Sequence, residues 1–124
     1  MVKSNVPRPT DGELAILRVL WRRGPSTVRD VQGDLNHKRR TGYTTALKLL
    51  QIMTEKGLVR RDETDRAHVY EARLSEEQTQ GQLVRDLLDR AFGGAAEKLV
   101  MQALRAGKKP LPPEQMDEIR KLLD

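Results

Sequence analysis

The sequence predicts a mostly α-helical protein with one small β-hairpin, followed by a further, wholly helical region. Three observations predict this fold class. Apolar residues recur at helical spacing in three segments before residue 57, two short β-like runs follow that residue, and the pattern is helical again after residue 74. A chain of 124 residues has room for one ordinary domain, or for a small domain with an appendage.

The first two helical segments are short, and residues typical of helix ends bound both of them. The candidate caps are Thr10 or Asp11 for the first helix and Ser26 or Thr27 for the second. The expected stops are Gly24–Pro25 and Asn36. The residues expected to face inward are Leu14, Leu17, Leu20 and Trp21 in the first helix and Val28, Val31 and Leu35 in the second.

A third helix is predicted over residues 43–56, with one apolar side and one polar, basic side. Thr41 is a plausible cap and Gly57 a likely stop. The apolar stripe comprises Ala46, Leu49, Leu50 and Met53. The other face carries Tyr43, Thr44, Thr45 and Lys48. Short hydroxyl side chains and a lysine at the start of a helix can contact base edges in a major groove. Taken alone, this helix could equally be an ordinary amphipathic helix with a solvated face.

The segments after Gly57 favour the first of these two interpretations. Two β-like runs, Leu58–Asp62 and His68–Arg73, are joined by a polar turn through residues 64–66 and predict a hairpin. Three helices followed by a hairpin is the winged helix-turn-helix pattern. We therefore expect a winged-helix DNA-binding domain over residues 1–74, which contacts double-stranded DNA through helix 43–56 and the wing 58–73.

The charge distribution supports the same hypothesis. Residues 1–74 hold 15 Lys and Arg against 9 Asp and Glu, a net charge of +6, whereas residues 75–124 hold 8 against 9, a net charge of −1. The positive field therefore lies on the part expected to touch a polyanion. The candidate phosphate contacts are Lys3, Arg8, Arg39, Arg40, Arg60 and Arg66, and the further candidate DNA-binding residues are Thr41, Tyr43, Thr44, Thr45 and Lys48.

Composition argues against several other classes of protein. The chain has no cysteine, which removes disulfides, thiol catalysis and cysteine-based metal sites. Its four aromatic residues are too few for the stacking platforms of many RNA-binding modules. Neither His37 nor His68 has a second ligand or a carboxylate at a recognisable spacing. We therefore expect no catalytic site, no metal and no cofactor. No apolar run approaches membrane-spanning length and the start lacks a signal peptide, so we expect a cytoplasmic protein without membrane insertion.

Residues 75–124 predict three short amphipathic helices that form a dimerisation region. Ser75 and Gln78 resemble a capping box, and Gly93–Gly94, Gly107 and the prolines at 110–113 separate the helices. Helices of this size bury too little surface to stand alone, so we expect them to pair with a second copy of the chain. The alternative is that they fold back on the first half. The residues expected at the dimer interface are Leu83, Val84, Leu87, Leu88, Phe92, Leu99, Val100, Leu104, Ile119, Leu122 and Leu123.

Long strings of residues also resemble a known family. They are Glu13-Leu-Ala-Ile-Leu-Arg-Val-Leu-Trp21, the stretch from Tyr43-Thr-Thr45 to Glu55-Lys-Gly-Leu-Val59, Ala67-His-Val-Tyr70 and Leu83-Val-Arg-Asp-Leu-Leu-Asp-Arg-Ala-Phe-Gly-Gly94. From Thr10 to Leu123 the chain resembles the penicillinase, methicillin-resistance and copper-transport repressors of bacteria, the BlaI/MecI/CopY family. The resemblance implies a homodimeric repressor that binds palindromic operators. In the best-known members, a membrane sensor protease responds to a β-lactam and leads to cleavage of the repressor's C-terminal region.

Two departures from the family pattern leave the inducing signal, the operator sequence and the regulated genes open. The β-lactam-responsive members carry an Asn-Phe scissile pair where this chain has Val100-Met-Gln102-Ala103, and the copper-sensing members carry Cys-x-Cys motifs. A function from another class is a winged-helix adaptor that binds an acidic protein partner. Such an adaptor would have an apolar patch on the surface of the third helix.

Overall fold

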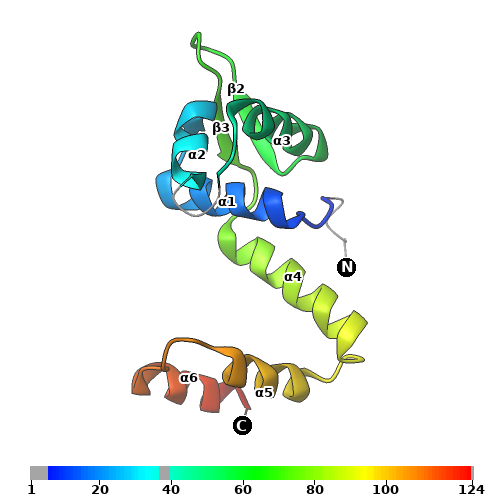
Figure 1. Cartoon of the computed structure of the whole chain (residues 1–124). Helices are drawn as coiled ribbons and strands as arrows, with labels where there is room; N and C mark the ends of the chain where they lie inside the picture. Colours follow the sequence, from blue (N-terminus) through cyan, green and yellow to red (C-terminus); the bar gives the residue numbers. More distant parts are fainter. Residues whose placement is uncertain (1–5, 37–39, 124) are drawn as a thin grey trace. The chain divides into compact units, whose positions relative to one another are not determined.

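The computed structural model describes residues 6–36 and 40–123, the side chain of Leu123 excepted. The elements in chain order are α1 (Asp11–Arg23), β1 (Ser26–Thr27), α2 (Val28–Leu35), α3 (Tyr43–Lys56), β2 (Val59–Asp62), β3 (Val69–Ala72), α4 (Glu76–Ala91), α5 (Ala96–Ala106) and α6 (Pro113–Leu123) (Figure 1). Their contacts divide the chain into two compact units, Met1–Val84 and Arg85–Asp124. The predicted fold class, mostly helical with a small hairpin, is confirmed.

Reciprocal capping boxes start the first two helices. Thr10 caps α1, because its hydroxyl accepts from the Glu13 N–H and the Glu13 carboxylate accepts from the Thr10 N–H. Thr27 and Asp30 make the same two bonds at the start of α2. Each box satisfies two backbone donors that a helix start leaves open. Of the alternative caps considered from the sequence, Thr10 and Thr27 are therefore the ones used.

The start of α3 differs from the prediction. Gly42 occupies the cap position and no side chain bonds the first turn, so the assignment of Thr41 as the cap is wrong. The Thr41 backbone is engaged elsewhere: its N–H donates to Asn36 Oδ1 at 2.6 Å and its carbonyl accepts from Gln32 Nε2 at 3.4 Å. These bonds attach the chain before α3 to the end of α2. At its other end, α3 stops as predicted at Gly57, whose φ of 81° lies in the left-handed region.

The hairpin is part of a three-stranded antiparallel sheet with the order β1-β3-β2. The predicted pairing of β2 with β3 is confirmed, with Val59 opposite Ala72 and Asp62 opposite Val69. The third strand, β1, was not predicted from the sequence. It has only two residues, Ser26 and Thr27, and pairs with the inner edge of the wing, so it carries no alternation of its own.

One core serves the three helices and the sheet. It comprises Ile16, Leu17, Val19, Leu20, Val28, Val31, Leu35, Ala46, Leu50, Met53, Leu58, Val59 and Tyr70. Leu14, Trp21 and Leu49, predicted to face inward, are only half-buried. The Trp21 indole nevertheless has a structural role, because its N–H donates to the Leu74 carbonyl at 3.0 Å and so attaches the end of the wing to α1.

A buried ion pair connects the start of α1 to the end of α3. Lys56 Nζ lies 3.0 and 2.9 Å from the two carboxylate oxygens of Glu13, whose side chain is only 2% exposed. Burial alone would raise the pKa of Glu13. The hydrogen bond from Lys56, the backbone N–H of Thr10 and the Lys56 charge outweigh burial and hold the Glu13 pKa below its ordinary value of 4.5. The carboxylate is therefore stabilised where a lone buried charge would be strongly unfavourable.

The first turns of α4 belong to the first unit. Ser75 and Gln78 form the predicted capping box, with reciprocal bonds of 3.0 and 2.9 Å. Thr79 is buried, and Gln82 Nε2 donates to the Val6 carbonyl at 2.9 Å. These contacts explain why the boundary between the compact units lies within α4, later than residue 74. The functional division at residues 74 and 75 stays a prediction.

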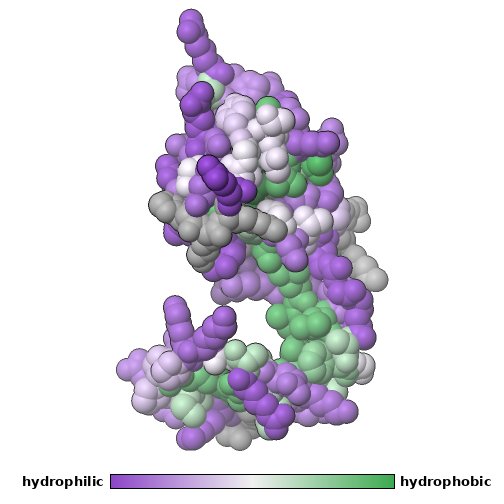
Figure 2. Space-filling view, viewed as in Figure 1, coloured by the Kyte–Doolittle hydropathy of each residue, from purple (hydrophilic) through white to green (hydrophobic). Residues whose placement is uncertain are grey.

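The second unit has no buried residue among those that the structure describes between residues 85 and 122. Gly93 and Gly94, both with positive φ, end α4 and separate it from α5, as predicted. The large apolar side chains exposed on α4 and on the following segments are Val84, Leu87, Met101, Leu104, Leu111, Met116 and Leu122. Apolar surface is visible in green along these elements in Figure 2. Helices with uncovered apolar stripes need a further surface to pack against.

Replacing Lys56 with Met should lower the free energy of unfolding by about 3 kcal/mol, because the Glu13 carboxylate then stays buried without its cation. Lys48→Met, at an exposed position of the same helix, is the matched control and should change it by less than about 0.5 kcal/mol. Urea unfolding followed by circular dichroism measures both variants.

The effect of Lys56→Met should depend on pH with a defined sign. Because the folded-state pKa of Glu13 is lowered, its contribution is present above the ordinary pKa and is lost as the pH falls through the folded-state value. The difference between wild type and Lys56→Met should therefore shrink in acid. A difference that is the same at pH 7 and well below pH 4 would contradict this assignment.

Candidate nucleic-acid interface

The polar face of α3 is the centre of the candidate interface. Ala46, Leu50 and Met53 are fully buried and anchor one side of the helix in the core. The side chains on the opposite side at the start of the helix, Tyr43, Thr44, Thr45 and Lys48, are all exposed, as are Gln51 and Glu55. Only Tyr43 among these presents a large apolar surface, so α3 lacks the apolar patch expected of an adaptor. The helix presents hydroxyl, amide and ammonium groups to its surroundings.

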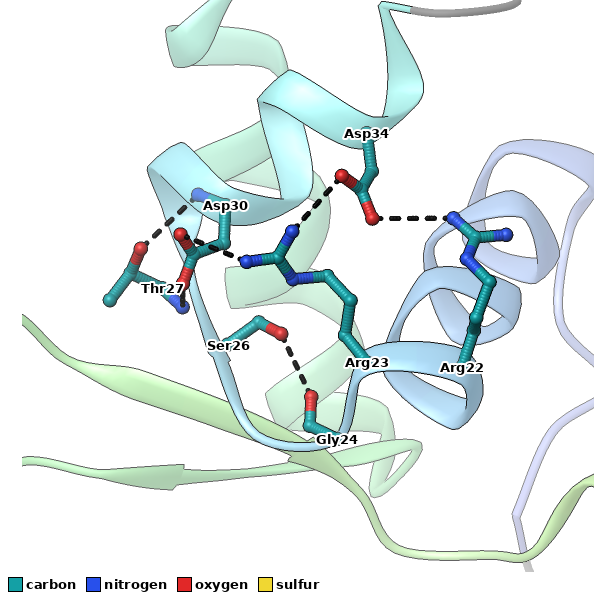
Figure 3. A network of polar contacts seen from close by, with 7 residues as sticks. All are labelled: Arg22, Arg23, Gly24, Ser26, Thr27, Asp30 and Asp34. Carbon is teal, nitrogen blue, oxygen red and sulfur yellow. Dashed lines mark hydrogen bonds and ion pairs between the residues drawn. The ribbon is translucent and has the colours of Figure 1, made fainter.

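A cluster of ion pairs fixes α2 against the end of α1 (Figure 3). Asp34 accepts from Arg22 at 3.3 Å and from Arg23 at 3.1 Å, and Asp30 lies 3.4 Å from Arg23. The hydrogen bond that the Thr27 backbone N–H donates to the Asp30 carboxylate holds the pKa of Asp30 below its ordinary value. Desolvation opposes this effect, while the Thr27 side chain and the Arg23 charge add to it. Two arginines at the end of α1 are thus neutralised within the protein. They hold the helices together, and the sequence analysis did not assign them to DNA.

Arg29, in the first turn of α2, was missed by the sequence analysis. Its guanidinium lies over the Tyr43 ring, 5.8 Å from the centroid, and so connects α2 to the start of α3. A cation near a helix N-terminus opposes the helix dipole, typically at about 0.3–1 kcal/mol. A cation over an aromatic face recovers a similar amount. One sequence signal could have identified this contact: an arginine stands just after the Thr27 cap, where the helix dipole disfavours a cation.

Some arginines of the wing are paired with a carboxylate of the wing, whereas Arg66 is paired with no described carboxylate. Arg60 pairs with Glu71, its cross-strand neighbour, at 3.4 Å, and Arg61 pairs with Glu63 at 2.7 Å. Asp62 accepts from the Thr64 N–H at 2.9 Å and also from its hydroxyl, which shapes the turn at the wing tip. Arg66, beyond that turn, is exposed and is in no ion pair among the described residues.

The other predicted contact residues are placed as follows. Arg8 and Arg40 are exposed and Thr41 is half-buried. Lys3 and Arg39 lie outside the described residues. The structure thus brings Tyr43, Thr44, Thr45 and Lys48 together on one helix face, and Tyr43 and Arg66 line one cleft. Their role in binding stays a prediction.

The predicted dimer residues lie on α4, α5 and α6, apart from Phe92, which directly follows α4. Val84, Leu87, Leu104 and Leu122 are exposed, whereas the others with described side chains, namely Leu83, Leu88, Phe92, Leu99, Val100 and Ile119, are half-buried. Leu123 ends α6, and its side chain is not described. None of these described side chains is fully buried within its own unit. Their availability is compatible with the predicted dimer and does not test it.

Residues 6–36 and 40–123 contain no cluster of three or more His, Asp or Glu side chains that could hold a metal ion. In the same part of the chain, no helix combines the length and apolar character needed to span a bilayer.

Three helices with a hairpin packed on them, and an exposed polar face on the third helix, define a winged-helix protein. The chain matches the family described as penicillinase repressor over residues 9–124, and it belongs to that family. The resemblance found in the sequence is thereby confirmed.

A curated relative resembles part of the chain, and two solved structures share the winged-helix fold. The transcriptional regulator BlaI of Mycobacterium tuberculosis is 40% identical over 68 residues, which are 54% of this chain and 49% of the relative. The chain thus spans about half the length of the curated relatives it matches. The solution structure of monomeric Bacillus licheniformis BlaI in complex with the blaP half-operator has a TM-score of 0.51 and 22% identity, covering 58% of this chain and 88% of that one. The solution structure of the DNA-binding domain of the repressor BlaI has a TM-score of 0.52, also at 22% identity, covering 60% and 90%.

Proposed function

We propose that the chain is a sequence-specific DNA-binding transcriptional repressor. Its α3 enters the major groove of an operator, and the wing contacts the neighbouring backbone. The observation that most strongly supports this function is the polar face of α3. Thr44, Thr45 and Lys48 are exposed together on it, while the opposite side of the helix is buried in the core. Short polar side chains on a rigid helix can approach base edges closely. Family membership, and the relative with a half-operator in its structure, support this assignment.

The proposed repressor acts as a homodimer. Exposed apolar side chains such as Leu87 and Leu104 form stripes on α4 and α5, and no described residue of the second unit is buried. A two-fold partner with the same stripes would cover them. Two copies of α3 would then lie about one DNA turn apart, roughly 34–36 Å, and bind the two halves of a palindrome.

We do not propose that proteolysis releases this repressor from DNA. The residues Val100–Ala103, within α5, stand where the β-lactam-responsive relatives resembled by this chain carry their Asn-Phe pair. A protease that requires that pair would find no equivalent bond here.

A salt-titrated binding assay tests the DNA-binding function. Fluorescence anisotropy would compare a duplex from the chain's own upstream intergenic region with a scrambled duplex of equal length. Because Lys and Arg displace counterions from phosphates, affinity for both duplexes should fall steeply with salt, and the upstream duplex should keep an advantage as salt rises. Absence of binding to either duplex at low salt would contradict the proposal.

Thr45→Ala and Lys48→Ala should each weaken binding to the operator by about 1–3 kcal/mol and binding to scrambled duplex by less, because base contacts exist only on the correct sequence. Glu55→Ala, an exposed position near the other end of α3, is the matched control and should change neither affinity appreciably. The same anisotropy assay measures all three variants. Equal losses on operator and scrambled duplex would show that this face contacts only the backbone.

Leu87→Glu should give a monomer with an intact winged-helix unit, because it places a charge in the apolar stripe where the partner would pack. Arg85→Glu, at an exposed position outside the stripe of the same helix, introduces the same side chain and should leave the dimer intact. Sedimentation velocity measures the assembly and circular dichroism the fold. Operator affinity should fall toward the non-specific level only for Leu87→Glu. A dimeric Leu87→Glu, or a monomer with full operator affinity, would refute the proposed role of these helices.

A further inference from the structure

A small cleft opens where α2, α3 and the wing meet. It has a volume of about 220 Å³. Its lining residues are Thr27, Val28, Arg29, Tyr43, Leu47, Arg66, Ala67, His68 and Tyr70. We propose that this cleft binds one phosphate of the DNA backbone through Arg29, Arg66 and His68, and that the bound phosphate fixes the start of α3 on the duplex. This inference rests on the proposed DNA-binding function and adds to it a specific phosphate site.

The charge of the cleft fits an anion. Among the described residues that line it, two are arginines, one is a histidine and none carries a carboxylate. Neither Arg29 nor Arg66 takes part in an ion pair with any other described residue. By contrast, Arg23, Arg60 and Arg61 are each paired with an Asp or Glu of the same unit. The charges of Arg29 and Arg66 are therefore not neutralised within the described residues, and both are available to an external anion.

The geometry around Arg29 leaves its donors available. The guanidinium carbon of Arg29 lies over the Tyr43 ring, at 5.8 Å from the centroid. The Arg29 guanidinium donates no hydrogen bond to any described residue, so its N–H groups are available for a further acceptor. An arginine oriented by an aromatic ring can donate two parallel hydrogen bonds to a phosphate, which an ammonium cannot reproduce.

The position of the cleft explains why a duplex would supply the phosphate. Tyr43 is the first residue of α3, and Thr44 and Thr45, the proposed base contacts, follow it directly. A helix whose first turn enters the major groove has backbone phosphates beside that turn. Arg66 and His68 come from the wing, and Arg29 comes from α2. One phosphate held by all three would connect the wing to the recognition helix, and phosphate contacts of this kind set the register of a protein on DNA.

Single phosphates can be neutralised to test the site. Operator duplexes with one methylphosphonate at the equivalent position of each half-site, moved through successive positions, would be measured by anisotropy against wild type and Arg29→Ala. With wild type, neutralising one phosphate per half-site should weaken binding about tenfold, and Arg29→Ala should weaken binding to the unmodified duplex by a similar factor. Combining the two changes should cost less than about twofold beyond either one, since both remove the same contact.

The controls separate a shaped site from general attraction. Arg18, exposed on α1 and outside the cleft, carries the same charge, so Arg18→Ala should change affinity less than twofold and should add fully to the methylphosphonate effect. Arg29→Lys keeps the charge but loses the planar fork and should recover only part of the affinity. Losses from Arg29→Ala that add independently to every methylphosphonate would overturn the proposal.

Further outcomes have defined meanings. Wild type must first bind the unmodified duplex: no binding at that step overturns the DNA-binding function and the assignment of the cleft with it, whereas wild-type binding that Arg29→Ala leaves unchanged overturns the assignment of the cleft alone. If inorganic phosphate at millimolar concentration weakens duplex binding by wild type more than by Arg29→Ala at matched ionic strength, the duplex and free phosphate share the cleft, as proposed. If Arg29→Ala loses affinity for inorganic phosphate but keeps full affinity for the duplex, the cleft is a site for free phosphate, and the assignment to the DNA backbone is overturned.

Discussion

The position of α3 depends on one buried carboxylate. Glu13 closes the capping box at the start of α1 and also binds Lys56, the last residue of α3, so a single side chain fixes two helix ends. The other end of α3 is held by the bonds that attach Thr41 to Gln32 and Asn36. Held at both ends, the helix presents its polar face without reorganisation. Contacts made by a rigid helix lose less conformational entropy on binding than those made by a mobile one.

The sequence predicted most of the features that are set by neighbouring residues, the cap of α3 excepted, and missed those set by distant ones. The cap at Thr10 and the helix stop at Gly57 depend on local backbone geometry, and both have clear residue signatures. Strand β1, the contact of Arg29 with Tyr43 and the pairing of Glu13 with Lys56 depend on the folded arrangement. Of the candidate site, the polar face of α3 follows from helical periodicity alone. The cleft beside it combines three separate elements and has no sequence signature.

The two units differ in how far their apolar side chains are buried. The first closes a core around Leu50 and Tyr70, whereas the second presents apolar side chains such as Leu87 and Met101 on its surface. Large uncovered apolar surfaces in a folded protein are typical of interaction sites. The proposed function divides the roles accordingly: the first unit would hold side chains in place for DNA, and the second would gain its stability from association with another copy. In such an arrangement, the association of two chains and operator affinity are thermodynamically coupled.

Selection from a random duplex pool would show whether two copies of this chain bind DNA as the proposed symmetric pair. The full-length protein would be used to enrich bound duplexes over several rounds at moderate salt, followed by sequencing. A symmetric pair should enrich an inverted repeat whose half-sites are centred about 10 base pairs apart, or a multiple of that spacing, because its two α3 helices would enter successive major grooves on one side of the duplex. Enrichment of a single unrepeated motif, or of no motif, would contradict it.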